Sequence, residues 1–189
     1  RDYVQNIVPR ANMKIIVSVG ELSNRKNHIA VLKALKHISD IDYCYIICGR
    51  EMTNKGTKKI LEKYASENKV NLLLLGQRND LPEILNCCDL GIIPSIREGL
   101  GLSGIETLAC GVPLIGNNVQ GIKDYIVEDL NGYLVNINDE NQLYKKILHC
   151  LTGKKWERNV ISNTVRKFSK ETCIKEMTAI YSDILNTFM

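Results

Sequence analysis

The chain has 189 residues, and with 44% hydrophobic and 24% charged residues its composition is that of a globular protein rather than a disordered or fibrous one. The 25 Lys and Arg residues against 21 Asp and Glu residues leave a net charge of only +4, which is too small and too scattered to indicate a nucleic-acid partner. The seven cysteines form no Cys-x-x-Cys pair, so we expect buried thiols in a reducing, cytoplasmic environment rather than a zinc site or a redox motif.

Short apolar runs alternate with amphipathic stretches along most of the chain. The apolar runs predict strands over residues 14–19, 43–48, 70–75, 90–94, 113–115 and 132–135. Helices are predicted between them over residues 29–38, 60–64 and 81–85, with another beginning near Leu102. Asp80, followed three residues later by Glu83, has the pattern of a helix N-cap. From about residue 139 only helical patterns remain, including one over residues 156–168.

Runs that are apolar throughout, rather than alternating, indicate a sheet covered on both faces, and hence parallel strands joined by crossover helices. We therefore predict an α/β fold, a Rossmann-like doubly wound parallel sheet of about six strands with C-terminal helices. In this interpretation residues 1–189 are a single domain with a helical tail over about 139–189. Ligands of such sheets bind where the strands end, which makes the loops over 20–27, 49–55, 76–80 and 95–103 candidates for a site.

The loop after the fourth strand reads SIREGLGLSGIETLACGVP and places Glu98 and Glu106 eight residues apart. Gly99 and Gly101 can bring backbone N–H groups against an anion, and the helix beginning near Leu102 adds its positive end, which suits a phosphate or pyrophosphate. Glu106, about one turn into that helix, can accept two hydrogen bonds from a vicinal diol such as a ribose. The alternative is that these glycines only shape a tight turn.

The pattern Glu98-x7-Glu106, with EGLGLSGIETLACGVPLIG running on from it, resembles the signature of the retaining glycosyltransferases of family 4, which have the GT-B fold. The segments VGELSNRKNHIAVLKAL, YIICG, LLLLGQRNDLPEILNCCDLGIIPS and NGYLV fall in the order and spacing of that family. The resemblance covers nearly the whole chain and is greatest to bacterial capsule and exopolysaccharide transferases.

The resemblance implies two catalytic residues, Glu98 in contact with the transferred sugar and Lys26 neutralising the departing diphosphate. It implies that Glu106 binds the ribose hydroxyls and that Arg78 lies where the base is bound. The backbone of the glycine loop would bind the pyrophosphate through Gly99, Leu100, Gly101, Leu102 and Ser103. The nucleotide-sugar is a co-substrate in this interpretation, and neither a cofactor nor a metal is expected.

The loop over residues 20–27, which follows the first predicted strand, departs from the family pattern, because Glu21 follows Gly20 where many members carry Arg. Gly20 is still assigned to the donor site, and Arg25, beside Lys26, is the residue that could supply the missing positive charge. His28 is expected on the surface of the helix that follows, with a role near the phosphates as the alternative.

The resemblance implies a glycosyltransferase that transfers sugar from a nucleoside diphosphate, with UDP expected, to a polysaccharide or lipid-linked oligosaccharide acceptor with retention. It also implies that this chain is the C-terminal, donor-binding half of a GT-B fold. The N-terminal acceptor domain would lie outside it, so the isolated half is expected to be inactive. The face carrying Ile174, Met177 and Ile180 would then be partly unburied, and a peripheral contact of the whole enzyme with the inner face of the plasma membrane is left open.

Two alternatives of other classes stay open, a non-catalytic Rossmann-like binding module and a GT-B-shaped UDP-sugar epimerase. A third is weaker. Gly99, Gly101 and Gly104 also spell the Gly-x-Gly-x-x-Gly fingerprint of dinucleotide-binding enzymes, but three strand–helix units precede the motif here, whereas in those enzymes it follows the first strand.

Overall fold

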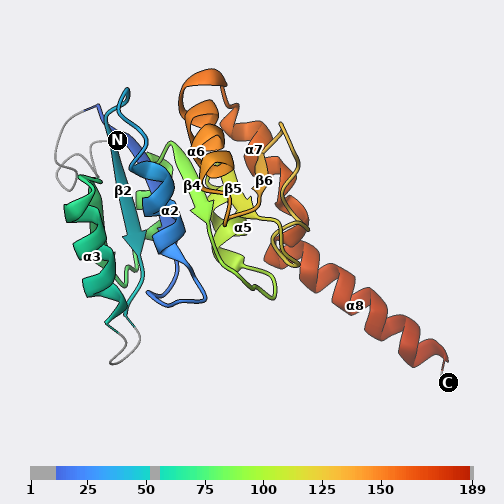
Figure 1. Ribbon diagram of the computed structural model, residues 1–189. Coiled ribbons are helices and arrows are strands. Elements are labelled where there is room, and N and C mark those ends of the chain that lie inside the picture. Colours follow the sequence, from blue (N-terminus) through green and yellow to red (C-terminus); the bar gives the residue numbers. More distant parts are fainter. Residues whose placement is uncertain (1–11, 52–55, 188–189) are drawn as a thin grey trace.

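The computed structural model describes residues 12–51 and 56–187, and its centre is a single parallel sheet (Figure 1). The strands are β1 (Lys14–Val19), β2 (Tyr43–Cys48), β3 (Leu72–Gly76), β4 (Leu90–Ile93), β5 (Leu114–Asn117) and β6 (Gly132–Val135). They are ordered β3-β2-β1-β4-β5-β6, and all neighbouring strands are parallel. This is the doubly wound order, so the predicted Rossmann-like fold is confirmed.

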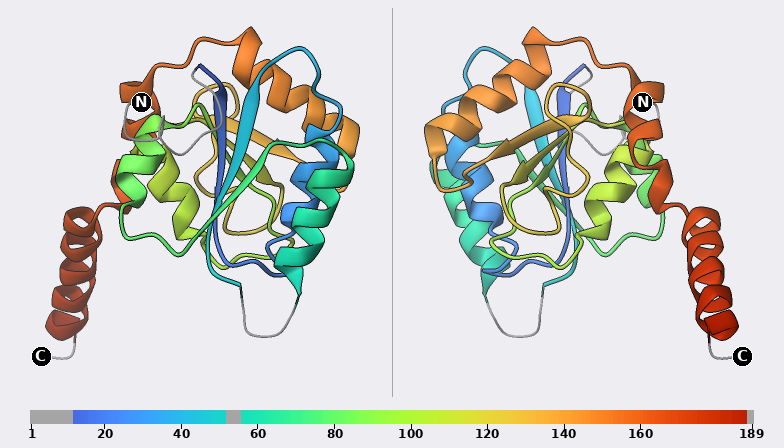
Figure 2. Two further views of the ribbon diagram at one scale, coloured as in Figure 1. Left: turned by 90° about the vertical axis from the view of Figure 1, so that its left-hand side faces the viewer. Right: turned by 90° about the vertical axis from the view of Figure 1, so that its right-hand side faces the viewer.

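Helices cover both faces of the sheet (Figures 1 and 2). One layer holds α2 (His28–Leu35), α3 (Thr57–Glu67) and α6 (Glu140–Leu148), and the other holds α4 (Leu81–Cys87), α5 (Leu102–Ala109) and α7 (Arg158–Thr164). Successive side chains of a strand point to opposite faces. Ile16 of β1 therefore packs in the core beneath α2 and α6, whereas its neighbours Ile15 and Val17 pack in the core beneath α4. A strand buried on both sides has to be apolar throughout, which is the pattern seen in the sequence.

The C-terminal part differs from the helix predicted over residues 156–168. A short π-helical turn (His149–Gly153) follows α6, and α7 begins only at Arg158. The indole of Trp156 donates a hydrogen bond to the carbonyl oxygen of Cys150 at 3.1 Å, and Glu157 is extended. The chain therefore folds back at Trp156 before it becomes helical. After Thr164 the chain makes one 3₁₀ turn (Arg166–Phe168) rather than continuing the helix.

The last helix, α8 (Lys170–Thr187), extends away from the rest of the domain and buries none of its residues (Figure 1). The predicted exposure of its apolar face is confirmed, because Ile174, Met177 and Ile180 are each about half exposed, at 54%, 52% and 56%. Among the described residues, no helix combines the length and the apolar character that a membrane crossing requires.

Candidate functional site

Strands β1 and β4 lie side by side at the centre of the sheet, and from them the strand order runs outward in opposite directions. In open α/β sheets such a switch point opens a crevice at the carboxyl ends of the strands. The loops that leave β1 and β4 meet there, since the N–H of Ile96 donates to the carbonyl oxygen of Arg25 at 2.9 Å. An open hollow of about 500 Å³ lies at their junction, lined by Val19, Gly20, Glu21, Arg25, Lys26, Glu98, Leu100, Gly101, Leu102 and Ser103.

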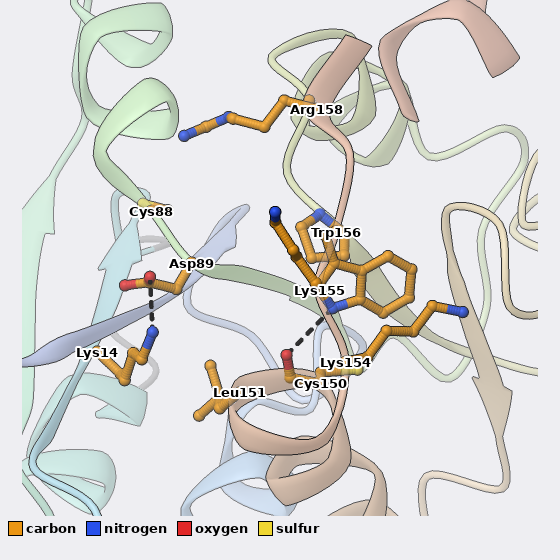
Figure 3. A pocket seen from close by; sticks show the side chains of 11 residues that line it. Lys14, Cys88, Asp89, Cys150, Leu151, Lys154, Lys155, Trp156 and Arg158 are labelled. Atoms are coloured by element: carbon orange, nitrogen blue, oxygen red, sulfur yellow. Dashed lines mark hydrogen bonds and ion pairs between the residues drawn. The ribbon is translucent and has the colours of Figure 1, made fainter. Parts of the chain in front are cut away.

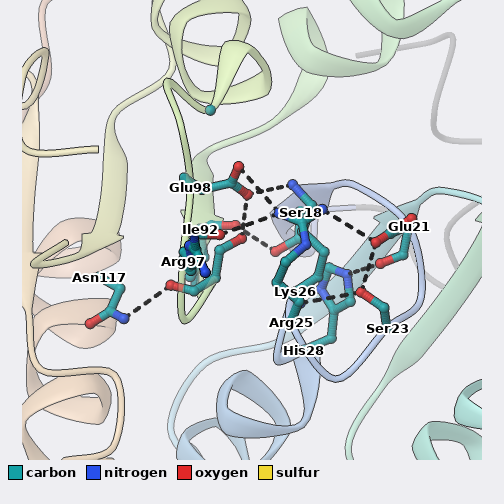
Figure 4. A network of polar contacts seen from close by, with 12 residues as sticks. Ser18, Glu21, Ser23, Arg25, Lys26, His28, Ile92, Arg97, Glu98 and Asn117 are labelled. Carbon is teal, nitrogen blue, oxygen red and sulfur yellow. Dashed lines mark hydrogen bonds and ion pairs between the residues drawn. The ribbon is translucent and has the colours of Figure 1, made fainter. Parts of the chain in front are cut away.

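The two predicted catalytic residues contact each other across this hollow (Figure 4). The Lys26 ammonium lies 2.5 Å from Glu98 Oε1, which also accepts a hydrogen bond from Ser95 at 2.7 Å. The Glu98 and Lys26 side chains are only 9% and 13% exposed, so their charges face each other largely out of water. Burial raises the pKa of Glu98, but the hydrogen bonds from Lys26 and Ser95 and the neighbouring positive charges outweigh it and hold that pKa below its ordinary value.

Arg25 lies at the rim of the hollow and bridges its two sides. Its guanidinium contacts Glu98 at 3.5 Å and Glu21 at 3.3 Å, and it donates to the carbonyl oxygen of Arg97. The Glu21 carboxylate also accepts a hydrogen bond from Ser23, and this bond is the main reason that the pKa of Glu21 is lowered. Glu21 departs from the family pattern, but its negative charge is not isolated. It is paired with Arg25, which in turn contacts Glu98.

The helix N-terminus expected at the glycine loop is present. Gly101 occupies the N-cap position of α5 with φ +70°, a left-handed conformation that favours glycine. The first N–H groups of α5 thus face the hollow from Leu102 and Ser103, and the positive end of the helix dipole lies beside Lys26. An anion in the hollow would meet a lysine, an arginine and a helix N-terminus together.

Buried polar side chains support the first loop from below. The sequence predicts His28 on the surface, but its side chain is only 2% exposed, because its helix turns it under the loop rather than outward. Its Nε2 lies 3.2 Å from the carbonyl oxygen of Glu21, and its Nδ1 lies 3.3 Å from the Tyr45 hydroxyl. Tyr45 donates in turn to Ser18, and Ser18 donates to the carbonyl oxygen of Ile92. This network joins the loop after β1 to strands β2 and β4.

The remaining predicted residues lie outside this hollow. Arg78 lines an adjoining hollow of about 390 Å³, which shares Gly20 and Glu21 with the first. Asp80 occupies the N-cap position of α4 as predicted, but its carboxylate binds the Arg78 guanidinium at 2.8 and 2.5 Å instead of capping the helix. Glu106 is exposed on α5 and lines neither hollow.

Gly99 does not line either hollow, but its backbone is closely packed. A Cβ atom at Gly121, where φ is +86°, would lie 2.2 Å from the carbonyl oxygen of Gly99. The glycine at position 121 therefore lets the loop that carries Glu98 lie directly against the segment after β5.

A sequence profile decides the family. The profile of the family described as "Glycosyl transferases group 1" matches residues 2–167. The chain belongs to this family. The matched region includes every predicted site residue, and the six-stranded sheet described above is its core.

Other glycosyltransferases resemble this group 1 member over nearly its whole length. It is 27% identical over 188 residues to UDP-Gal:alpha-D-GlcNAc-diphosphoundecaprenol alpha-1,3-galactosyltransferase of Escherichia coli, covering 93% of this chain and 47% of that protein. A glycosyltransferase structure from Rickettsia africae superposes with a TM-score of 0.90 at 22% identity, over 97% of this chain and 51% of that one. Anabaena HepE in complex with UDP-glucose superposes with a TM-score of 0.84 at 20% identity, over 98% and 52%.

These comparisons establish an enzyme family and a shared fold. The two structural likenesses are too distant in sequence to show more than the fold. The chain spans about half the length of the relatives it matches. Within the described ranges, 12–51 and 56–187, no three His, Cys, Asp or Glu side chains come together in a way that could hold a metal ion.

The buried support beneath the loop after β1 is not among the features predicted from the sequence. Ser18 and Tyr45 stand inside the apolar runs KIIVSV and YCYIIC, and a hydroxyl in a strand buried on both faces has to find a buried partner. That signal was present in the sequence. The partner, His28, could be identified only once the packing of α2 on the sheet was known.

Proposed function

We propose that this chain is the donor-binding half of a retaining glycosyltransferase that uses a UDP-sugar. The observation that supports it best is the hollow at the switch point, where Lys26, Arg25 and the N-terminus of α5 surround space for a diphosphate. The choice of UDP draws on the relatives, since the name of the Escherichia coli enzyme contains UDP-Gal and the Anabaena protein was solved with UDP-glucose.

In the proposed reaction, the bond between the anomeric carbon of the sugar and the diphosphate oxygen breaks, and negative charge builds on the leaving diphosphate. Lys26 and the N–H groups of α5 stabilise that charge electrostatically. The acceptor hydroxyl forms the new bond on the same face of the sugar, and its proton passes to the leaving phosphate. Glu98 contacts the transferred sugar, Glu106 the ribose hydroxyls and Arg78 the base, as the family resemblance implies.

The ion pair between Lys26 and Glu98 gives this proposal a specific first step. The Lys26 ammonium contacts the Glu98 carboxylate at 2.5 Å, which uses one of its three N–H donors. A diphosphate would compete for the same ammonium with more negative charge and more acceptor oxygens. Donor binding would therefore transfer Lys26 from Glu98 to phosphate and leave Glu98, held by Ser95, facing the sugar.

The acceptor side of the reaction is proposed to lie outside residues 1–189. Because the chain spans about half of its relatives, we propose that it forms the C-terminal domain and that an N-terminal domain of the same protein closes the cleft and binds the glycan or lipid-linked acceptor. The exposed apolar face of α8 would pack against that domain. We propose that the whole enzyme acts in the cytoplasm, with peripheral contact to the inner face of the plasma membrane where its acceptor is lipid-linked.

Calorimetric titration with UDP and a panel of UDP-sugars tests the donor site. We expect saturable binding to the wild-type chain and about tenfold or greater weakening in Glu106→Ala, because each hydrogen bond to a charged group contributes about 1.5–3 kcal/mol. Glu176→Ala, the same change at an exposed position of α8, is the matched control and should bind like wild type. Absence of heat in the wild type would favour a non-catalytic module instead, and sugar transfer by the isolated chain would contradict the proposed division of the active site.

A further inference from the structure

A further hollow lies at the opposite edge of the sheet, where β1, β4 and β5 begin. It has a volume of about 270 Å³ and lies between the start of β4, the turn after α5 and the segment that leads into α7 (Figure 3). Its charged and aromatic lining residues are Lys14, Asp89, Lys154, Lys155, Trp156 and Arg158. None of them belongs to the proposed donor site.

Among the described residues that line this hollow, four cationic side chains surround one carboxylate. Asp89 contacts the Lys14 ammonium at 3.3 Å and accepts the N–H of Ile15 at 2.9 Å with its other oxygen. Lys154 bonds instead to Asp129, outside the hollow. Lys155 and Arg158 carry the other two positive charges of the described lining.

Lys155 and Arg158 leave the same stretch of chain and extend over the hollow from one side (Figure 3). Arg158 donates to the carbonyl oxygen of Cys110 at 3.2 Å, which uses one of the five N–H groups of a guanidinium. A guanidinium fork and a lysine ammonium that line the same hollow suit a phosphate group, since the first binds two oxygens at once and the second adds a point charge.

The backbone around these side chains is held in place. A Cβ atom at Gly111, where φ is +72°, would lie 2.8 Å from the carbonyl oxygen of Arg158, so the start of α7 is packed directly on the turn after α5. The Trp156 ring is fixed by its hydrogen bond to Cys150 and forms one wall of the hollow. A site whose frame is already ordered loses less conformational freedom when a ligand binds.

We propose that this hollow binds a phosphate group through Lys155 and Arg158, on the edge of the sheet opposite the donor site. The phosphate could belong to a free phosphorylated metabolite or to the headgroup of an anionic lipid, which share this chemistry. The role is independent of the proposed donor site, because this hollow shares no lining residue with the hollow of Lys26 and Glu98 or with the adjoining one of Arg78.

Trp156 is the only tryptophan of the chain, so its fluorescence reports on this hollow alone. The chain is titrated with inorganic pyrophosphate at constant ionic strength, and separately with phosphatidic acid vesicles and with phosphatidylcholine vesicles. A saturable change with pyrophosphate supports a free phosphorylated ligand, and a change with phosphatidic acid vesicles alone supports a lipid headgroup.

The double variant Lys155→Gln, Arg158→Gln is expected to weaken the response about tenfold or more, and Lys155→Gln alone to weaken it less. Lys33→Gln with Lys59→Gln removes the same charge at exposed positions of α2 and α3 and should leave the response unchanged. Lys26→Ala, in the proposed donor site, should also leave it unchanged, which separates the two proposals. No saturable response of the wild type to either probe, or an equal response of the double variant, would overturn the inference.

Discussion

The buried imidazole under the first loop makes a quantitative prediction about acid stability. His28 is 2% exposed, and burial is the main cause that lowers its pKa from 6.5 to about 4. Because the folded-state pKa lies below the unfolded one, the unfolded chain takes up the proton first as the pH falls. The folded state is therefore fully stabilised above about pH 6.5 and loses stability as the pH falls toward 4.

The size of the loss follows from the difference between the two pKa values. Each pKa unit corresponds to about 1.4 kcal/mol, so this one group should lower the free energy of unfolding by about 2 kcal/mol between pH 7 and pH 5 and by about 3 kcal/mol at pH 4. That is a large part of the total stability of a typical domain, about 5–15 kcal/mol.

The assay is urea unfolding at a series of pH values, for the wild type and for His28→Gln. Glutamine keeps an N–H donor near the carbonyl oxygen of Glu21 but cannot become charged between pH 4 and 7. Other groups that titrate, such as Glu98 with its lowered pKa, are common to both proteins and cancel in the difference. The free energy of unfolding of the wild type, minus that of the variant, should fall by about 3 kcal/mol from pH 7 to pH 4. A difference that stays constant over this pH range would refute the assignment of His28 as a buried neutral side chain.

Three further substitutions test other contacts. Tyr45→Phe removes a hydroxyl that bridges two buried side chains and should cost about 1–3 kcal/mol in urea unfolding, whereas a neutral effect would argue against the network. Gly121→Ala forces a Cβ against the carbonyl oxygen of Gly99. We expect both the UDP affinity, measured by calorimetry, and the midpoint of thermal unfolding to fall. A variant that binds UDP as tightly as the wild type would show that the two segments can separate freely. Asn131→Ala removes hydrogen bonds of a fully buried amide to two backbone groups and one hydroxyl. This substitution should lower the free energy of unfolding by about 2–4 kcal/mol, and a loss below about 1 kcal/mol would contradict the stabilising role of these hydrogen bonds.

The sheet could be predicted from the sequence because burial on both faces leaves a strong local signal. The runs ending at Val19 and Cys48 coincide with β1 and β2, while the run predicted from residue 70 begins as a strand only at Leu72. The two loops that form the hollow could be predicted as well, since the carboxyl ends of parallel strands share one edge.

The pairing within the site could not be predicted, because it depends on how distant segments pack. Nothing local in the sequence indicates that Lys26 bonds to Glu98, 72 residues away. Likewise Asp80 has the residue type and spacing of a cap, but the Arg78 guanidinium competes for its carboxylate. Trp156 lies in a helical pattern, yet the hydrogen bond of its indole folds the chain back and delays the helix until Arg158.

The central claim, that the hollow between the loops after β1 and β4 holds the diphosphate of the donor, is tested most directly by a crystal structure of the chain with UDP. We expect diphosphate oxygens against the N–H groups of Leu102 and Ser103, with the Lys26 ammonium moved from Glu98 to phosphate. UDP bound elsewhere, or bound with the pair between Lys26 and Glu98 intact and no phosphate beside α5, would contradict it.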